Sequence, residues 1–510
     1  MSTDAAVTEL GAVALRALIG RRALSPVELM DACIARIEAL NPAVNALAAT
    51  DFERARTAAR AAEAAVMRGD ALGLLHGLPL GVKDLQDTAG LLTTGGSIGR
   101  RNHVPVRDNA LVARLRAAGA IVVAKTNVPD MGAGANTRNP VWGATGNPFN
   151  PNLNAGGSSG GSAAALALDM LPLATGSDTG GSLRIPAALC GVVGLRPSPG
   201  LVANDARPLG WSVISVLGPM ARDVADTRLL LRASAGLDAR DPLSCVQPDL
   251  DQPPAAVDLS RLRIGFTEDF GCCAVDPMVR RVFRDRIEGL QRLGAQCRPL
   301  TLDLADGHRV FDVLRAESFY AAYADTLASA PETLAPHVRA NVELAGRMTL
   351  GDRTWAHLTQ TRIARDFARA FDDVDLIVAP TSPVTPFAWT QLYAAEIDGQ
   401  PMENYYRWLA LTYLGTLATN PSLSLPCGVD EAGMPFGLQL MAPLRSDAWL
   451  LCAAQALEQA WSAQPGLCRP RPNVAALVDP RQAPQPALRS IVTHPPGTGR
   501  ASADGLATAV

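Results

Sequence analysis

The chain is poor in charged residues, in aromatic residues and in histidine. Of its 510 residues, 19% are charged and 5% are aromatic, six are histidine, and 48% are hydrophobic. The net charge of −3 and the lack of a long Lys/Arg run give no electrostatic footprint for nucleic acid. Such a composition predicts a sizeable core rather than global disorder, in one large domain or in two to three ordinary ones.

Sequence signals for membrane-spanning helices, for secretion and for disulfide or zinc cross-links are also missing. The longest apolar stretches, 120–124 and 163–168, are far shorter than the roughly 20 residues that a membrane-spanning helix needs. The first residues, Met-Ser-Thr-Asp-Ala-Ala, have no basic segment followed by an apolar one, as a secretory signal would. The nine cysteines are scattered and form no C-x-x-C pair, which argues against structural zinc and a disulfide framework. We therefore expect a cytoplasmic protein without membrane contact.

What the sequence does contain is an alternation of helix and strand patterns, which predicts the fold class α/β. Ser25–Glu28 is a capping box with proline at the first helical position, so a helix should run to about Leu40. An alanine-rich segment with interleaved charges predicts a second helix over 52–68. The remaining patterns predict helices at 109–118, 222–235, 403–419 and 446–461, and strands at 120–125, 171–175, 192–195, 262–266, 375–380, 422–426 and 436–441.

These elements predict a single large mixed β-sheet core sandwiched by helices, with a helical insertion. N-terminal helices over 1–70 would pack on the core of 71–300. The insertion would occupy 301–375, and the chain would return to the sheet over 376–465. The last segment, 466–510, is rich in Pro, Ala, Arg and Gly, and we expect a low-complexity tail that is wrapped on the core or disordered.

Two Gly-Gly-Ser clusters stand out, at Gly156–Ser159 and Gly180–Ser182. Glycine permits tight turns that bring backbone N–H groups close to a ligand, and serines in such turns are exposed hydroxyls beside those donors. A flexible linker is the alternative interpretation, but the tract between the clusters is apolar and helix-forming. The clusters therefore point to an acyl-transfer site.

Other catalytic motifs receive no support. The segment 157–161 formally matches the G-x-S-x-G nucleophile elbow, but that elbow must follow a strand, and the Asn- and Pro-rich segment 147–154 cannot be a central strand. The chain contains no H-E-x-x-H, P-loop or G-x-G-x-x-G motif. The histidines that follow the serines lie in helical or tail sequence without a supporting motif; they are His308, His337, His357 and His494.

A lysine base is the remaining possibility. Lysine accepts a proton only when neutral, which requires burial to lower its pKa from about 10.4 by as much as about 3–5 pH units. Lys83 ends the apolar run 78–82 and is the candidate. Most lysines at strand ends are exposed, so the apolar run alone does not identify Lys83 as a base. The ordered sequence blocks described next also support this assignment.

Ordered blocks along residues 10–462 resemble the amidase signature family, which includes the Ser-cisSer-Lys amidases and is related to the A subunit of glutamyl-tRNA(Gln) amidotransferase. The blocks are Gly77-Leu78-Pro79 through Lys83-Asp84, 124–127, Gly156-Gly157-Ser158-Ser159-Gly160-Gly161-Ser162, 176–186 (G-S-D-T-G-G-S-L-R-I-P), 191–198, 218–222, 378–381, 425–428 and 437–439. The paired serine blocks with a lysine upstream make the match specific.

The resemblance implies a role for each matching residue. Ser182 would be the nucleophile, Ser158 a bridging serine on a cis peptide, and Lys83 the base that acts through Ser158. Backbone N–H groups would form the oxyanion hole, at Thr179, Gly180, Gly181 and Ser182. Asp178 and Arg184 would support this loop without being catalytic. No cofactor and no metal are implied.

The pocket should be lined by segments that differ most from a shared core. The small-residue loop with Met131, Gly132 and Ala133 would leave space near the nucleophile, and Trp211 and Ile214 would line the other side. Aromatic residues at 387–389 and 405–408 would suit an apolar or aryl group, although Tyr405 and Trp408 could equally serve packing alone.

We therefore predict a metal-independent serine hydrolase that cleaves the C–N bond of a linear small-molecule amide through an acyl-enzyme, with aryl amide, ester or carbamate undecided. The alternative is the glutaminase A subunit of a tRNA-dependent amidotransferase; Gln360 stands where that branch has an arginine, and 444–447 replaces its acidic pair. A catalytically dead scaffold is disfavoured, because Lys83, Ser158 and Ser182 are all present. No nucleic-acid partner is expected, and a homodimer remains open.

Overall fold

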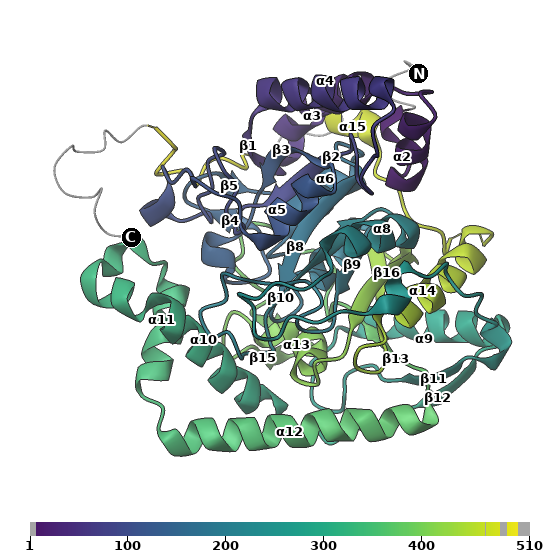
Figure 1. Ribbon diagram of the computed structural model, residues 1–510. Helices are drawn as coiled ribbons and strands as arrows, with labels where there is room; N and C mark the ends of the chain where they lie inside the picture. The colour runs from purple at the N-terminus through teal and green to yellow at the C-terminus, as the bar shows by residue number, and fades with distance from the viewer. Residues whose placement is uncertain (1–6, 465, 480–486, 498–510) are drawn as a thin grey trace.

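A mixed β-sheet of eleven strands forms the centre of the computed structural model, which describes residues 7–464, 466–479 and 487–497 (Figure 1). In spatial order the strands are β1 (Leu47–Thr50), β3 (Ile121–Thr126), β2 (Pro79–Lys83), β8 (Leu173–Asp178), β10 (Val216–Ala221), β9 (Val193–Arg196), β16 (Ser422–Val429), β17 (Pro435–Met441), β13 (Leu376–Pro380), β11 (Arg263–Phe266) and β12 (Gln296–Pro299). Strands β3, β2 and β8 pair in parallel, as do β13, β11 and β12, and all other neighbours are antiparallel. The predicted α/β class and mixed sheet are confirmed.

Helices cover both faces of this sheet. They are α2 (Ala12–Gly20), α3 (Pro26–Val44), α4 (Phe52–Arg68), α5 (Ala110–Ala117), α6 (Gly160–Ala167), α7 (Arg184–Cys190), α8 (Val224–Ser234), α9 (Pro277–Arg292), α13 (Ala410–Leu417), α14 (Asp447–Ser462) and the short α15 (Val474–Val478). One apolar cluster joins α3, α4 and α6 to the sheet, and a second, larger one joins α8, α9, α13 and α14 to it. Their burial is the main stabilising contribution to the sandwich.

Three further helices form the segment predicted as an insertion: α10 (Gly307–Ser329), α11 (Pro336–Gly346) and α12 (Leu350–Asp373). In Figure 1 they occupy the left and lower margin of the molecule, with α12 along its lower edge. Only the first part of α10 packs deeply, through Val310, Phe311 and Leu314. The insertion packs on the sheet domain through the start of α10 and through α12, whose buried Phe367 contacts the Phe270 ring (6.3 Å between centroids).

Several elements differ from the sequence prediction for local reasons. The segment predicted as N-terminal helices also supplies the edge strand β1. Helix α13 begins at Ala410 rather than near 403, because the Asn404 side chain accepts from Tyr406 N (3.1 Å) and its carbonyl from Arg407 N (3.2 Å), forming a turn that competes with the helix. Strand β10 contains Pro219 and was not predicted; its pairing with β9 begins only at Met220, so the missing N–H of proline is tolerated.

Short two-stranded ribbons lie outside the large sheet. One pairs β6 (Gly146–Asn147) with β7 (Asn150–Asn154), so the Asn-rich segment is indeed not a central strand. The others pair β4 (Arg138–Asn139) with β5 (Gly143–Ala144), and β14 (Glu396–Ile397) with β15 (Gln400–Pro401). In the tail, Leu477 and Leu488 are buried against the core, while 480–486 and 498–510 lie outside the described residues. No helix in the described ranges is both long and apolar enough to cross a membrane.

Candidate active site

The site lies where two parallel strands end. Strand β2 ends at Lys83 and its neighbour β8 ends at Asp178. Carboxyl ends of parallel neighbours meet at the same edge of a sheet, which is where ligands commonly bind in open α/β folds. The Lys83 N–H donates to Thr175 Oγ1 (3.0 Å), which locks the two strand ends together. The upstream lysine and the downstream glycine turn are thereby brought side by side.

Lys83 is fully buried and is surrounded by serine hydroxyls. Its Nζ lies 2.8 Å from Ser158 Oγ, 2.8 Å from Ser159 Oγ and 2.9 Å from Ser177 Oγ. Burial lowers the pKa of Lys83 to about 7, although the attraction of Asp178 opposes that change. A lysine with such a pKa is substantially neutral at neutral pH, as a general base must be.

The two glycine-serine turns face each other at Lys83. The Gly157–Ser158 peptide bond is cis, and Ser158 is buried at the turn that leads into α6. The second turn follows β8 and holds Ser182, which is half-buried. The Ser159 N–H donates to the Ser182 carbonyl (3.2 Å), so the two turns are fastened by their backbones. In the described part of the chain no side chain hydrogen-bonds to Ser182 Oγ, which leaves this hydroxyl unengaged.

Backbone N–H groups of the second turn divide into two kinds. The Gly181 N–H donates to Asp178 Oδ1 (2.9 Å), so this donor is engaged by the loop itself. The N–H groups of Thr179, Gly180 and Ser182 have no acceptor among the described residues. Three backbone donors therefore stay available beside the Ser182 hydroxyl.

A buried ion cluster holds this turn in place. Arg184 contacts both carboxylate oxygens of Asp178 (3.0 and 2.9 Å), and Arg196 donates to the Asp178 carbonyl (2.7 Å). Burial opposes ionisation of Asp178, but the attraction of Arg184 and Arg196 outweighs it and holds the pKa of the carboxyl well below its usual range. Asp178 and Arg184 thus contact each other and the turn that carries Ser182.

Sequence reasoning missed several groups of this site. Ser159 and Ser177 contact Lys83 although no role was predicted for them; both lie inside the two quoted blocks, so their position was visible but their contact was not. Thr412 donates its hydroxyl to the Gly180 carbonyl (2.6 Å). It comes from α13, more than 200 residues downstream, and no local pattern marks it.

The residues predicted to line the pocket lie in different surroundings. Gly132 is adjacent to the serines, because a Cβ on it would lie 3.6 Å from Ser158 Oγ, and Ala133 is buried beside it. Ile214 is also buried, whereas Trp211 is 78% exposed. Met131 donates its N–H to Gly95 O (2.8 Å) and adopts a positive φ of 50°. The structure thus brings the 131–133 loop to the serines but leaves the Trp211 ring in solvent.

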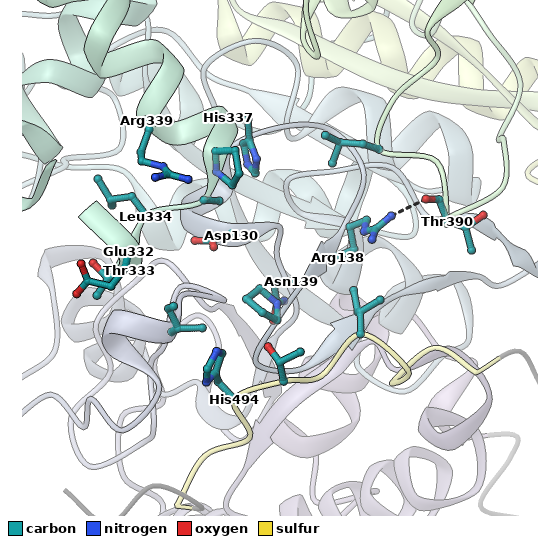
Figure 2. A pocket seen from close by; sticks show the side chains of 17 residues that line it. Asp130, Arg138, Asn139, Glu332, Thr333, Leu334, His337, Arg339, Thr390 and His494 are labelled. Carbon is teal, nitrogen blue, oxygen red and sulfur yellow. Dashed lines mark hydrogen bonds between the residues drawn. The ribbon is translucent and has the colours of Figure 1, made fainter. Parts of the chain in front are cut away.

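Behind that loop lies a cavity of about 510 Å³ (Figure 2). Asp130, Arg138 and His337 are among its lining residues, and Lys83, Ser158 and Ser182 are not. Burial raises the pKa of Asp130 to about 7 and lowers the pKa of His337 to about 4. This cavity is therefore separate from the Lys83 cluster, although Asp130 is only two residues from Gly132.

The described residues form no metal-binding cluster, and the Cys427 thiol is not a reactive one. In residues 7–464, 466–479 and 487–497 no group of three or more His, Cys, Asp or Glu side chains is arranged to hold a metal ion. Burial raises the pKa of the Cys427 thiol to about 12, as expected of a small buried side chain that fills space. His308 contacts Tyr413 and the Cys272 carbonyl rather than either serine turn.

Comparison with known proteins agrees with this geometry. The family model for amidase matches residues 28–451. The A subunit of glutamyl-tRNA(Gln) amidotransferase from Acaryochloris marina is 34% identical over 462 residues, covering 85% of this chain and 94% of that one; its counterpart from Roseiflexus castenholzii is 36% identical over 473 residues, covering 87% and 94%. A bacterial aryl acylamidase of the amidase signature enzymes superposes with a TM-score of 0.82 at 26% identity, covering 88% of this chain and 96% of that one. The chain therefore belongs to the amidase signature family.

Proposed function

We propose that the chain hydrolyses an amide through an acyl-enzyme on Ser182, with Lys83 as base and Ser158 as relay. The Ser182 hydroxyl attacks the amide carbonyl carbon while its proton passes to Ser158, whose own proton passes to Lys83. The observation that carries this proposal is the buried Lys83 Nζ at 2.8 Å from Ser158 Oγ, with a pKa of about 7.

The same groups then return the proton during breakdown of the tetrahedral intermediate. The oxygen anion of the tetrahedral intermediate would accept hydrogen bonds from the N–H groups of Thr179, Gly180 and Ser182, each such donor being worth about 2.7–4 kcal/mol. Collapse breaks the C–N bond, and the proton held by Lys83 returns through Ser158 to the leaving nitrogen. A water molecule then attacks the acyl-enzyme and releases the carboxylic acid and Ser182.

Two classes of amide are candidates for the substrate. The curated relatives are glutamyl-tRNA(Gln) amidotransferase A subunits, which favours glutamine as the amide and an assembly with other subunits. Two contacts favour a small-molecule amide and a chain that acts alone. Gln360, which stands where the amidotransferase branch has an arginine, is uncharged and donates to the Leu417 carbonyl (3.3 Å). Both carboxylate oxygens of Asp447 already accept hydrogen bonds, from the Ser198 N–H (2.8 Å) and the Ser198 hydroxyl (2.6 Å). Either amide would be cleaved by the same chemistry.

Activity of the purified chain tests the mechanism. Release of 4-nitroaniline from simple 4-nitroanilides, and of ammonia from glutamine and from small primary amides, would be measured without other proteins. Ser182→Ala should abolish both reactions, whereas Ser162→Ala is the matched control, since Ser162 is a serine of the first block that bonds Thr126 and the Thr175 carbonyl instead of Lys83. Undiminished hydrolysis by Ser182→Ala would refute the mechanism.

The same assay separates the two amides. Hydrolysis of small amides or anilides by the chain alone, well above that of glutamine, supports the free-standing amidase. Glutamine hydrolysis that appears only on addition of amidotransferase partner subunits would support the glutaminase role instead.

A further inference from the structure

Helix α10 connects the nucleophile loop to a second polar site. Phe311 lies against the loop, because a Cβ on Gly180 would be 3.0 Å from Phe311 Cζ. Arg315 follows four residues later, on the same face of the helix and about 6 Å further along its axis. The backbone of Arg315 is thus about one helical turn from Phe311, the residue that contacts the loop carrying Ser182.

Arg315 is a buried cation without a carboxylate partner. Only 6% of the residue is exposed, and its single hydrogen bond runs from Nη2 to the Tyr405 hydroxyl (2.6 Å). Its Nε is enclosed and has no acceptor, and within the described ranges no acidic side chain lies within 4.0 Å of the guanidinium. Two other buried arginines have a carboxylate partner, Arg184 with Asp178 and Arg407 with Asp312. Buried Arg228 has none among the described residues, but it donates to the backbone carbonyls of Leu250 (3.2 Å) and Gln252 (2.8 Å).

Aromatic rings surround this cation and offset part of the cost of its burial. The Arg315 Cζ lies 4.5 Å from the Phe319 ring centroid, 4.8 Å from that of Tyr406 and 5.4 Å from that of Tyr405. Such contacts are attractive. A charge removed from water is costly unless it is paired and hydrogen-bonded, so the rings alone do not compensate fully for burial of the guanidinium.

Neighbouring groups also have unsatisfied polar atoms and contact the loop beside the serines. The Tyr405 hydroxyl accepts from both Arg315 and Asn341 (2.9 Å), which leaves its own O–H free to donate, and the Asn341 Oδ1 has no partner. The Tyr405 ring also lies 3.6 Å from the position of a Cβ on Gly134, two residues beyond Gly132, which borders Ser158. The cluster of Arg315, Asn341 and Tyr405 is therefore connected to the catalytic groups both through α10 and through the 131–134 loop.

We propose that Arg315 binds a carboxylate group of the amide substrate. The inference rests on the proposed amide hydrolysis and narrows its substrate class to amides that carry an anionic group. A carboxylate would accept from the guanidinium and from the Tyr405 hydroxyl and would neutralise the buried charge.

Matched pairs of substrates test this proposal. Glutaryl and adipoyl 4-nitroanilides carry a terminal carboxylate, and the 5-methylhexanoyl and 6-methylheptanoyl 4-nitroanilides are their neutral isosteres. N-acetyl-4-aminobenzoate and N-acetyl-4-isopropylaniline form the same comparison on the amine side. We expect kcat/KM of the wild-type protein to favour the anionic member of one pair by about 100-fold, which is the scale of a buried charge-assisted contact. Arg315→Met should abolish that preference while hydrolysis of the neutral member persists.

Two controls make the outcome specific. Arg309→Met removes an arginine of the same helix that pairs with Asp352 and lies over the Trp355 ring at the surface, and it should keep the preference. Calorimetric titration of glutarate and adipate into the Ser182→Ala protein, with and without Arg315→Met, measures carboxylate binding independently of turnover. Loss of hydrolysis of both members in Ser182→Ala, with carboxylate binding intact, separates the catalytic proposal from this one.

Two results would overturn the inference. One is equal kcat/KM for the anionic and neutral members of every pair. The other is dicarboxylate binding to the Ser182→Ala protein that is absent, or is unchanged by Arg315→Met. In either case the guanidinium would serve only to stack the surrounding rings.

Discussion

The titration of Lys83 is the most direct test of the site, and the composition of the chain makes it accessible. The sequence contains two lysines, Lys83 and Lys125, and both are buried. Protein labelled with ¹³C at the lysine ε-carbon should therefore show two lysine resonances. We expect the Lys83 resonance to titrate near pH 7 and that of Lys125 near pH 8, because burial lowers the pKa of each. The spectrum of Lys83→Met assigns the two signals.

The same pKa should govern activity. Lys83 acts as a base only when neutral, so kcat/KM should fall below about pH 7 with the slope of one proton. Ser177→Ala removes a hydroxyl that accepts from Lys83 Nζ at 2.9 Å. Losing an acceptor of the ammonium disfavours the charged form, so both the resonance and the acid limb of the rate profile should move to lower pH. A Lys83 signal that titrates near 10, or an acid limb that does not follow it, would refute the lysine base.

Stability should carry the same signature with a defined sign. The unfolded chain keeps Lys83 protonated up to about pH 10.5, whereas the folded chain keeps it protonated only below about pH 7. Between these values the unfolded state binds more protons, so the free energy of unfolding contributed by Lys83 rises with pH. The whole interval, at about 1.4 kcal/mol per pH unit, corresponds to about 5 kcal/mol. Below pH 7 that cost of burial is present in full.

Denaturant unfolding measures this contribution as a double difference. The unfolding free energy of the wild-type protein minus that of Lys83→Met should rise by about 2 kcal/mol between pH 7 and pH 9, because Lys83 is already half deprotonated in the folded chain at pH 7. Contributions that do not change with the protonation of Lys83, such as a change in packing, cancel in this comparison. A difference that stays constant over this range would mean that Lys83 titrates normally in the folded chain.

Three substitutions test the contacts that hold the Ser182 turn in place. Gly181→Ala should lower kcat by about 100-fold with little change in far-UV circular dichroism. The φ of Gly181 is +118° and a Cβ there would lie 2.2 Å from Thr412 Oγ1, so the loop must shift. An unchanged kcat would show that the loop accommodates the methyl group without displacing the nucleophile. Arg184→Met should cost about 3–5 kcal/mol in denaturant unfolding, since it leaves buried Asp178 with a weaker partner, and a loss below about 1 kcal/mol would contradict that. Thr412→Val keeps the shape but leaves the Gly180 carbonyl without its donor; we expect a loss of about 1–3 kcal/mol and a lower kcat at unchanged KM, and a change in KM alone would place Thr412 in substrate binding instead.

Much of the fold could be predicted from the sequence because local capping and turn signals agree with the tertiary structure. The helix at 52–68 has the same bounds in the structure, since Asp51 caps it and Gly69 ends it in a left-handed conformation. The Ser25–Glu28 capping box is present with both hydrogen bonds. Strand β12 and helix α9 were not predicted, although Asp276 and Pro277 are an N-cap and a first-turn proline that could have revealed the helix. The start of α13 was misplaced because a side-chain turn at Asn404 competes with helical hydrogen bonding there.

The sequence alone determined which residues are available for chemistry: two glycine-serine turns, a lysine at the end of an apolar run, and a family pattern that joins them. It could do so because tight turns and buried strands leave local signatures in residue type and spacing. Tertiary structure alone decided what those residues contact. The parallel pairing of β2 with β8 brings Lys83 to Ser158, Ser159 and Ser177, and its burial there lowers its pKa. Likewise Arg315 looks like any helical arginine in the sequence. Only the packing of distant segments around it shows a buried cation that has no carboxylate partner among the described residues.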